Sequence, residues 1–171
     1  SIGHGLSQKP EWWMHKHNAS AGGVYGHIGL TNPATYYLYY NTNAQSGADA
    51  NQWNSTAPTN SLIHMGSSGN TNGTGTNGMV SYAWHSVKGY SAFGSYEGNA
   101  STDGPFINTG FYPNAAMVKN IDATNNWCLW DTAFKPDNGG GEFIYPDITN
   151  IMSTTIYNDF LSNGMKHRTA N

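Results

Sequence analysis

Apolar residues in this chain recur in short alternating runs, without the three-to-four-residue spacing of an amphipathic helix. In residues 79–87, Val80, Tyr82 and Trp84 alternate with smaller or polar side chains, as in a strand with two different faces. Gly, Asn, Pro and Ser bound each run and mark turns. We expect at most one short helical turn, around Ile151–Phe160. The pattern predicts strands at Glu11–Lys16, Gly23–Ile28, Tyr36–Asn41, Ser61–Met65, Met79–Val87, Ala92–Tyr96, Ala115–Lys119, Asn126–Asp131, Glu142–Tyr145 and Gly164–Arg168.

The second half of the chain repeats the first. A fixed internal repeat constrains architecture before any single residue is interpreted. We therefore expect an all-β fold, an antiparallel β-sandwich of jelly-roll or concanavalin-like type, built from similar halves at roughly 2–90 and 91–171. Because each half offers only short strands, we expect one unit over residues 1–171. The corresponding segments are Gly5-Leu6 and Gly110-Phe111, Met14–Ser20 and Met117–Thr124, Tyr37–Tyr39 and Phe143–Tyr145, and Ile63–Gly66 and Met165–Arg168.

The repeat is incomplete at both ends. The second half has no copy of the strand at 79–87, and nothing before Ile2 corresponds to residues 93–96. Either a longer chain or a neighbouring subunit supplies the missing strands. An unpaired sheet edge invites strand addition, which favours the second explanation. Clusters of Asn, Asp, Gly, Ser and Thr predict loops at residues 18–23, 67–78, 122–126 and 139–141.

Composition points to a polar but weakly charged surface. Charged residues make up 10 % of the chain, against roughly 25 % in an ordinary globular domain. Asn and Gly each occur 21 times, and aromatic residues reach 13 %. Solubility therefore comes from amides and hydroxyls, and the aromatic content argues against a disordered chain. This composition is typical of an extracellular or virion β protein.

Charge excludes some partners. The net charge is −3 and the seven Lys and Arg form no cluster, so nucleic acid is not an expected partner. No apolar stretch reaches the length of a membrane span. The single Cys128 cannot form an internal disulfide, and its apolar neighbours indicate a buried structural thiol.

Several motifs together resemble a β-sandwich domain, of concanavalin or laminin-G type, found in tail-fibre and other virion structural proteins of tailed phages. The resemblance covers essentially the whole chain and implies a structural role on a virion, with no catalytic residues to carry over. His15, His17 and Gly23 depart from it, since ordinary strand residues and an aromatic are expected there. The motifs are Ile2–Leu6 with Lys9-Pro10, Trp53–Thr59, Gly89–Asn99, Thr102–Phe111, Trp130–Ala133 and Phe160–Gly164.

Metal and cofactor sites are weakly indicated. His15 and His17 lie two residues apart on a predicted strand and so share a face, but two surface or groove histidines are the simpler interpretation. Asp103 and Asp122 offer single carboxylates to Ca²⁺, without any calcium-loop motif. Turn formation explains both residues better. We therefore expect no cofactor and no metal.

Catalytic motifs are equally sparse. Ten carboxylates are spread thinly, and no sequence motif pairs two of them as a glycosidase requires. No nucleophile elbow and no phosphate-binding loop occurs. We therefore expect a protein that is not an enzyme.

Adjacent aromatic residues suggest binding surfaces. Trp12 and Trp13 must point to opposite sheet faces, so one lies outside a given core. Exposed aromatics suit either packing against another subunit or stacking on a sugar, for which Trp53 is the candidate. Sequons occur at Asn18, Asn54, Asn72 and Asn99.

Two functions fit these observations. The first is a non-enzymatic structural subunit of a phage fibre or extracellular filament, a homo-oligomer or helical polymer that acts by self-association and surface display. The second is a lectin-like receptor-binding module that recognises host surface glycans. Both place the protein on a virion or outside the cell.

Overall fold

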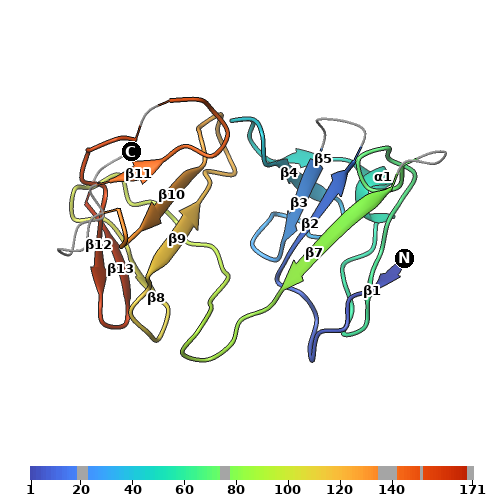
Figure 1. Cartoon of the computed structure of the whole chain (residues 1–171), viewed down its shortest axis with the longest axis horizontal. Helices are drawn as coiled ribbons and strands as arrows, with labels where there is room; N and C mark the ends of the chain where they lie inside the picture. Colours follow the sequence, from blue (N-terminus) through green and yellow to red (C-terminus); the bar gives the residue numbers. More distant parts are fainter. Residues whose placement is uncertain (19–22, 74–77, 135–141, 151, 169–171) are drawn as a thin grey trace. The chain divides into compact units, whose positions relative to one another are not determined.

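The computed structural model describes residues 1–18, 23–73, 78–134, 142–150 and 152–168. Within them the protein is an all-β fold of antiparallel sheets with a single four-residue helix, α1 (Ala50–Trp53) (Figure 1). The chain folds into two compact units. Unit 1 contains residues 1–86 and 120–125, and unit 2 contains residues 87–119 and 126–171. The expectation of one unit over residues 1–171 stays a prediction.

Unit 1 is built on a five-stranded antiparallel sheet in the order β5-β4-β3-β2-β7. A ribbon of β1 and β6 and the helix α1 complete the unit. Asp49 begins α1 by accepting from Asn51 N–H, and Asn54 ends it in the left-handed conformation. The strands are β1 (Ile2–Gly3), β2 (Trp12–His17), β3 (Gly23–His27), β4 (Tyr36–Tyr39), β5 (Gly47–Ala48), β6 (Leu62–Ile63) and β7 (Met79–Trp84).

The core of unit 1 lies on one face of this sheet. Burial alternates along β2, where the odd-numbered residues are buried and the even-numbered ones half-buried. Trp13 and Val24 from the sheet meet Trp53 from α1 and Ile63 from β6 in one apolar cluster. The sequence expectation that Trp12 and Trp13 point to opposite faces is therefore confirmed.

Unit 2 consists of two three-stranded antiparallel sheets, ordered β11-β10-β9 and β12-β13-β8. Trp130 and Phe143 of the first sheet pack with Phe160 and Met165 of the second in one buried cluster. This packing of two antiparallel sheets is that of a β-sandwich. The strands are β8 (Phe106–Asn108), β9 (Ala115–Val118), β10 (Cys128–Asp131), β11 (Phe143–Ile144), β12 (Asn158–Leu161) and β13 (Gly164–His167).

Strand registers correspond between the two units at the residues that repeat in sequence. In unit 1, Ile2 of β1 pairs with Ile63 of β6, and in unit 2, Ile107 of β8 pairs with Met165 of β13. The meander β2-β3-β4 likewise corresponds to β9-β10-β11. Tyr25 is opposite Leu38 in the first meander, and Leu129 is opposite Ile144 in the second.

Large and small residues exchange places between the two meanders. In unit 1, Trp13 of β2 covers Gly26 of β3, where an added Cβ would lie 2.0 Å from the indole. In unit 2, the equivalent pair is Ala116 of β9 opposite Trp130 of β10. Each core thus holds one indole at this pair of positions, from β2 in unit 1 and from β10 in unit 2, so the volume filled there is similar in both.

Some sequence expectations were wrong. Residues 92–96 form no strand, although Ser91 makes an isolated bridge to Val87. The helical turn expected at 151–160 is absent from its described residues, which include a bridge at Ser153 and the start of β12. Four strands were missed: β1, β5, β8 and β12. The predicted glycine loop at 139–141 and part of the loops at 18–23 and 67–78 lie outside the described residues.

Candidate interaction surfaces

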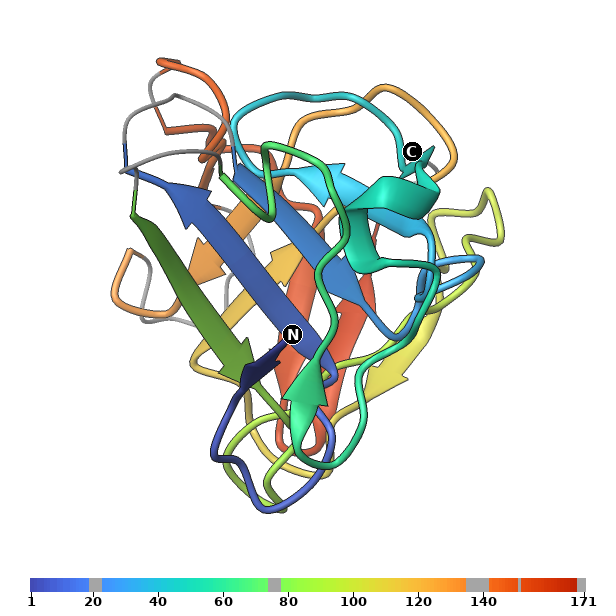
Figure 2. The same ribbon diagram turned by 90° about the vertical axis from the view of Figure 1, so that its right-hand side faces the viewer.

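One edge of β7 has no partner among the described strands (Figure 2). The Gly78 C=O accepts from Asn18 N–H, just after β2, and the Trp84 C=O accepts from Glu11 N–H, just before it. The backbone N–H and C=O groups of the even-numbered residues of β7 therefore point toward β2. Backbone groups alternate between the two edges of an antiparallel strand. The N–H and C=O groups of Met79, Ser81 and Ala83 therefore point away from β2, and no described strand pairs with them.

This edge carries exposed apolar side chains and no charge. Its six residues read Met-Val-Ser-Tyr-Ala-Trp, without a charged residue or a proline. Val80 is 46 % exposed and Tyr82 is 47 % exposed. A long, uncharged and partly apolar edge is the kind of strand that pairs with another chain.

A second open edge lies on β9 in unit 2. The C=O of Asn114 accepts from Thr132 N–H at 2.8 Å, so even-numbered residues here face β10. The backbone groups of Ala115 and Met117 therefore point to the other edge, which no described strand covers. The corresponding edge of β2 in unit 1 is covered by β7. Open edges thus occur in both units.

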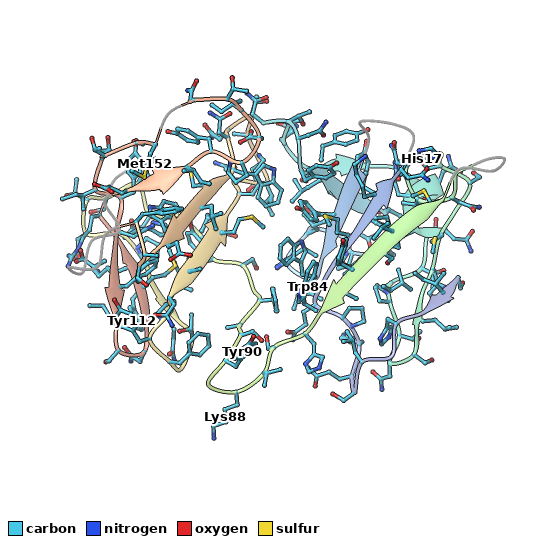
Figure 3. The ribbon with its side chains drawn as sticks, viewed as in Figure 1. His17, Trp84, Lys88, Tyr90, Tyr112 and Met152 are labelled. Carbon is cyan, nitrogen blue, oxygen red and sulfur yellow. The ribbon has the colours of Figure 1, made fainter. Side chains whose placement is uncertain are left out.

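Aromatic side chains form a row on the face of unit 1 opposite its core. The Trp12 and Trp84 rings stack with centroids 4.6 Å apart, and Tyr82 stacks on Trp84 with an interplanar angle of 11°. Tyr25 continues the row, with its ring 5.1 Å from that of Trp12. These contacts fix Tyr82 and Trp84 in rigid positions on β7, and the Trp84 label in Figure 3 marks the end of this strand.

Trp53 does not lie on an exposed surface. It is 1 % exposed, its ring packs edge-to-face against Trp13 at 5.5 Å, and its Nε1 donates to Tyr36 C=O at 2.8 Å. Both its apolar surface and its polar atom are therefore used inside unit 1. The assignment of Trp53 to sugar stacking fails for this physical reason. Tyr82 is an exposed aromatic of the sheet, and Trp84 beside it is half-buried.

His15 and His17 share a face of β2 as expected, but they face the core and not a surface. His15 is fully buried beside Trp53, and no described residue bonds either ring nitrogen. Burial lowers the pKa of His15 to about 4, so its imidazole is neutral at pH 7. The His17 ring lies against the backbone of Gly73, where an added Cβ would come within 2.8 Å of it.

Several of the carboxylates have structural partners. Asp103 forms an ion pair with Lys166 at 2.7 Å, which lowers the pKa of this exposed carboxyl. Asp122 lies in a turn in which Asn120 Oδ1 accepts from the backbone N–H groups of Asp122 and Ala123. Among the described residues, no three His, Cys, Asp or Glu side chains gather as a metal site would require. Further carboxylates that accept from backbone N–H groups or pair with arginine are Glu11, Asp49, Asp131, Asp147 and Asp159.

The remaining candidates are a thiol and the sequons. Cys128 is half-buried on the core side of β10, and burial, followed by the nearby Asp147 carboxylate, raises its pKa to about 11. The thiol is therefore protonated and unreactive at neutral pH. The four sequon asparagines are all exposed. Two of them use their side-chain amides, with Asn72 donating to Gly66 C=O and Asn99 donating to Asp103 C=O.

Sequence reasoning found β7 as a strand but missed that it ends the sheet. Its composition gave no signal of this position, because six residues without charge or proline lack the usual protection of an edge and are more typical of a strand inside a sheet. Strand order, which decides which strand is the edge, depends on contacts distant in sequence.

Comparison with family models matches the whole chain, residues 1–171, to a family described as a domain of unknown function, DUF7483. The chain belongs to this family. Comparisons with curated proteins and with solved structures gave no match. No helix among the described residues has the length and apolar character needed to cross a membrane.

Proposed function

We propose that this DUF7483 domain is a non-enzymatic structural subunit of a phage fibre or similar extracellular filament. It acts by self-association through its sheet edges and by display of its polar loops. The single observation that carries the proposal is the uncharged edge of β7, which no described strand pairs with, and beside which Val80 and Tyr82 are exposed.

Low charge supports the same function. Charged residues make up 10 % of the chain, so contacts between copies bury few ions and avoid the cost of removing them from water. The structural roles of the carboxylates support a protein without catalysis, since ion pairs and backbone bonds occupy those around β7, β10 and β12. The resemblance to tail-fibre domains points to the same class.

Sedimentation velocity of the 171-residue chain over a range of concentrations tests the proposal, with negative-stain microscopy of the heaviest fraction. We expect weight-average mass to rise with concentration. A chain that stays monomeric at every concentration contradicts the proposal.

A second function is favoured by the aromatic row. Tyr82 is exposed and stacked on Trp84, which gives a flat, rigid surface of the kind that holds a sugar ring. A lectin-like module using these residues would bind glycans on an array and lose binding in Tyr82→Ala. Tyr90 is 81 % exposed on the loop after β7, so Tyr90→Ala is the matched control (Figure 3).

A further inference from the structure

We propose that two copies of this chain pair edge to edge through β7, antiparallel about a twofold axis at Ser81. The inference rests on the proposed function and names the contact through which self-association begins. It joins the two five-stranded sheets into one continuous sheet.

β7 is distinguished from the other edge strands by length and lack of protection. It has six residues, whereas β5 and β11 have two each and β8 has three, preceded by Pro105. β12 carries Asp159, and β9 is followed at once by Lys119. Short strands, prolines and charges are the usual means of blocking an edge. β7 has none of them.

The outward backbone groups of β7 are spaced for pairing with an identical strand. Met79, Ser81 and Ala83 present their N–H and C=O groups away from β2. With Ser81 on the axis, Ser81 faces Ser81 of the second copy and Met79 faces Ala83. Each such hydrogen-bonded pair exchanges two bonds, so the contact forms up to about six backbone hydrogen bonds.

The same register covers the exposed side chains. Val80 and Tyr82 flank Ser81, so an antiparallel pair about Ser81 places Val80 of one copy directly opposite Tyr82 of the other. These are non-hydrogen-bonded positions, where side chains come closest. A β-branched residue opposite an aromatic is a favourable cross-strand pair. The two exposed apolar residues of β7 therefore cover each other.

The occupant is a second copy because the strand is self-complementary. In a twofold contact both copies contribute the same strand, so any charge on that strand enters the short contact twice with the same sign and is repelled. β7 carries no charge, and the small Ser81 lies where the two strands must approach most symmetrically. A charged or asymmetric partner would gain nothing from these features.

A charge on the exposed side of the edge tests the contact. Tyr82→Lys puts an ammonium group opposite Val80 of the second copy, whereas Tyr90→Lys makes the same change on the exposed loop after the strand. We expect Tyr82→Lys to weaken self-association by about tenfold or more. Tyr90→Lys should associate as the unmodified chain does. Circular dichroism of both variants verifies that they stay folded.

Disulfide trapping tests the register. In a Cys128→Val background, Ser81→Cys places two thiols across the axis at a Cα separation of about 5.5 Å, within disulfide range. Mild oxidation should give a covalent dimer, and Ser95→Cys, on an exposed position outside the strands, should give far less.

The outcomes separate two kinds of failure. A wild-type chain that never associates overturns both the proposed function and this inference. Association that survives Tyr82→Lys unchanged, without a Ser81→Cys dimer, overturns only the β7 contact and directs attention to the open edge of β9. Weakening by both Tyr→Lys variants equally would also overturn the β7 contact, because the effect would then be one of net charge.

Discussion

Burial of His15 makes the stability of unit 1 depend on pH. The imidazole is fully buried, no described residue bonds its nitrogens, and its pKa in the folded protein is lowered to about 4 by desolvation. An unfolded chain holds this histidine at the ordinary value of about 6.5. Between these two values the unfolded chain binds the proton and the folded one does not. Stability is therefore complete above about pH 6.5 and falls as the pH drops toward 4.

The size of the effect follows from the two pKa values. Lowering the pH from 7 to 5 should cost about 2 kcal/mol of unfolding free energy through His15 alone. At this chain length that corresponds to a fall in Tm of about 4–8 °C. His27 and His167, whose pKa values are also lowered by burial, act in the same direction. The contribution of His15 must therefore be isolated by substitution.

His15→Val is the natural variant, because Val118 occupies the corresponding position of β9. Valine fills most of the same space and removes two buried nitrogens that no described residue bonds, so the fold should persist. Urea unfolding followed by tryptophan fluorescence at pH 7 and pH 5 gives the free energies. We expect the loss between these pH values to be about 2 kcal/mol smaller in His15→Val than in the wild type. Equal losses in the two proteins would refute the account of His15.

Three further predictions concern packing and reactivity. Trp53→Ala should lower the unfolding free energy by about 3–5 kcal/mol in urea titrations, and an effect below 1 kcal/mol would show that Trp53 is not a core residue. Trp13→Ala and Gly26→Trp should each strongly lower the unfolding free energy. The double variant copies the Ala116–Trp130 pair of unit 2 and should recover part of this loss. Losses in the double variant equal to the sum of the single ones would contradict the idea that the two positions share one volume. Cys128 should react with iodoacetamide at pH 8 about 100-fold more slowly in the folded protein than in urea, because its pKa is raised to about 11, and equal rates would show an accessible thiolate.

Long alternating runs made the main strands predictable from sequence. β2, β3, β7 and β9 lie within two or three residues of their expected bounds, because alternation over four to six residues reports directly on the two faces of a strand. β1 (Ile-Gly) and β5 (Gly-Ala) contain a glycine and at most one large apolar residue, whereas the equally short β6 (Leu-Ile) and β11 (Phe-Ile) hold two and were predicted. β12 was misjudged as helical, although the two-residue turn Ser162-Asn163 that follows it, with Leu161 paired to Gly164, closes a hairpin.

Candidate sites were less predictable, because burial depends on contacts far apart in sequence. Trp53 was the candidate for an exposed ring that stacks on a sugar, but α1 directs its ring into the core beside Trp13. The histidines at 15 and 17 alternate with Lys16, which suggested a surface. The strand instead places its odd-numbered residues against the core. Alternation determines which residues share a face, but it does not determine which face is buried.

Amide hydrogen exchange along β7 tests the central claim, self-association through this edge, most directly. The backbone N–H groups of Val80, Tyr82 and Trp84 point toward β2 and should be protected at every concentration. The N–H groups of Met79, Ser81 and Ala83 point away from β2 and should exchange freely in the monomer. The account predicts that the amides of Met79, Ser81 and Ala83 gain protection as the chain associates. At each concentration, the protected fraction of each amide should be at least the fraction of the chain that is in the dimer. If the chain associates while these three amides remain unprotected, the β7 edge is not the contact and the account is contradicted.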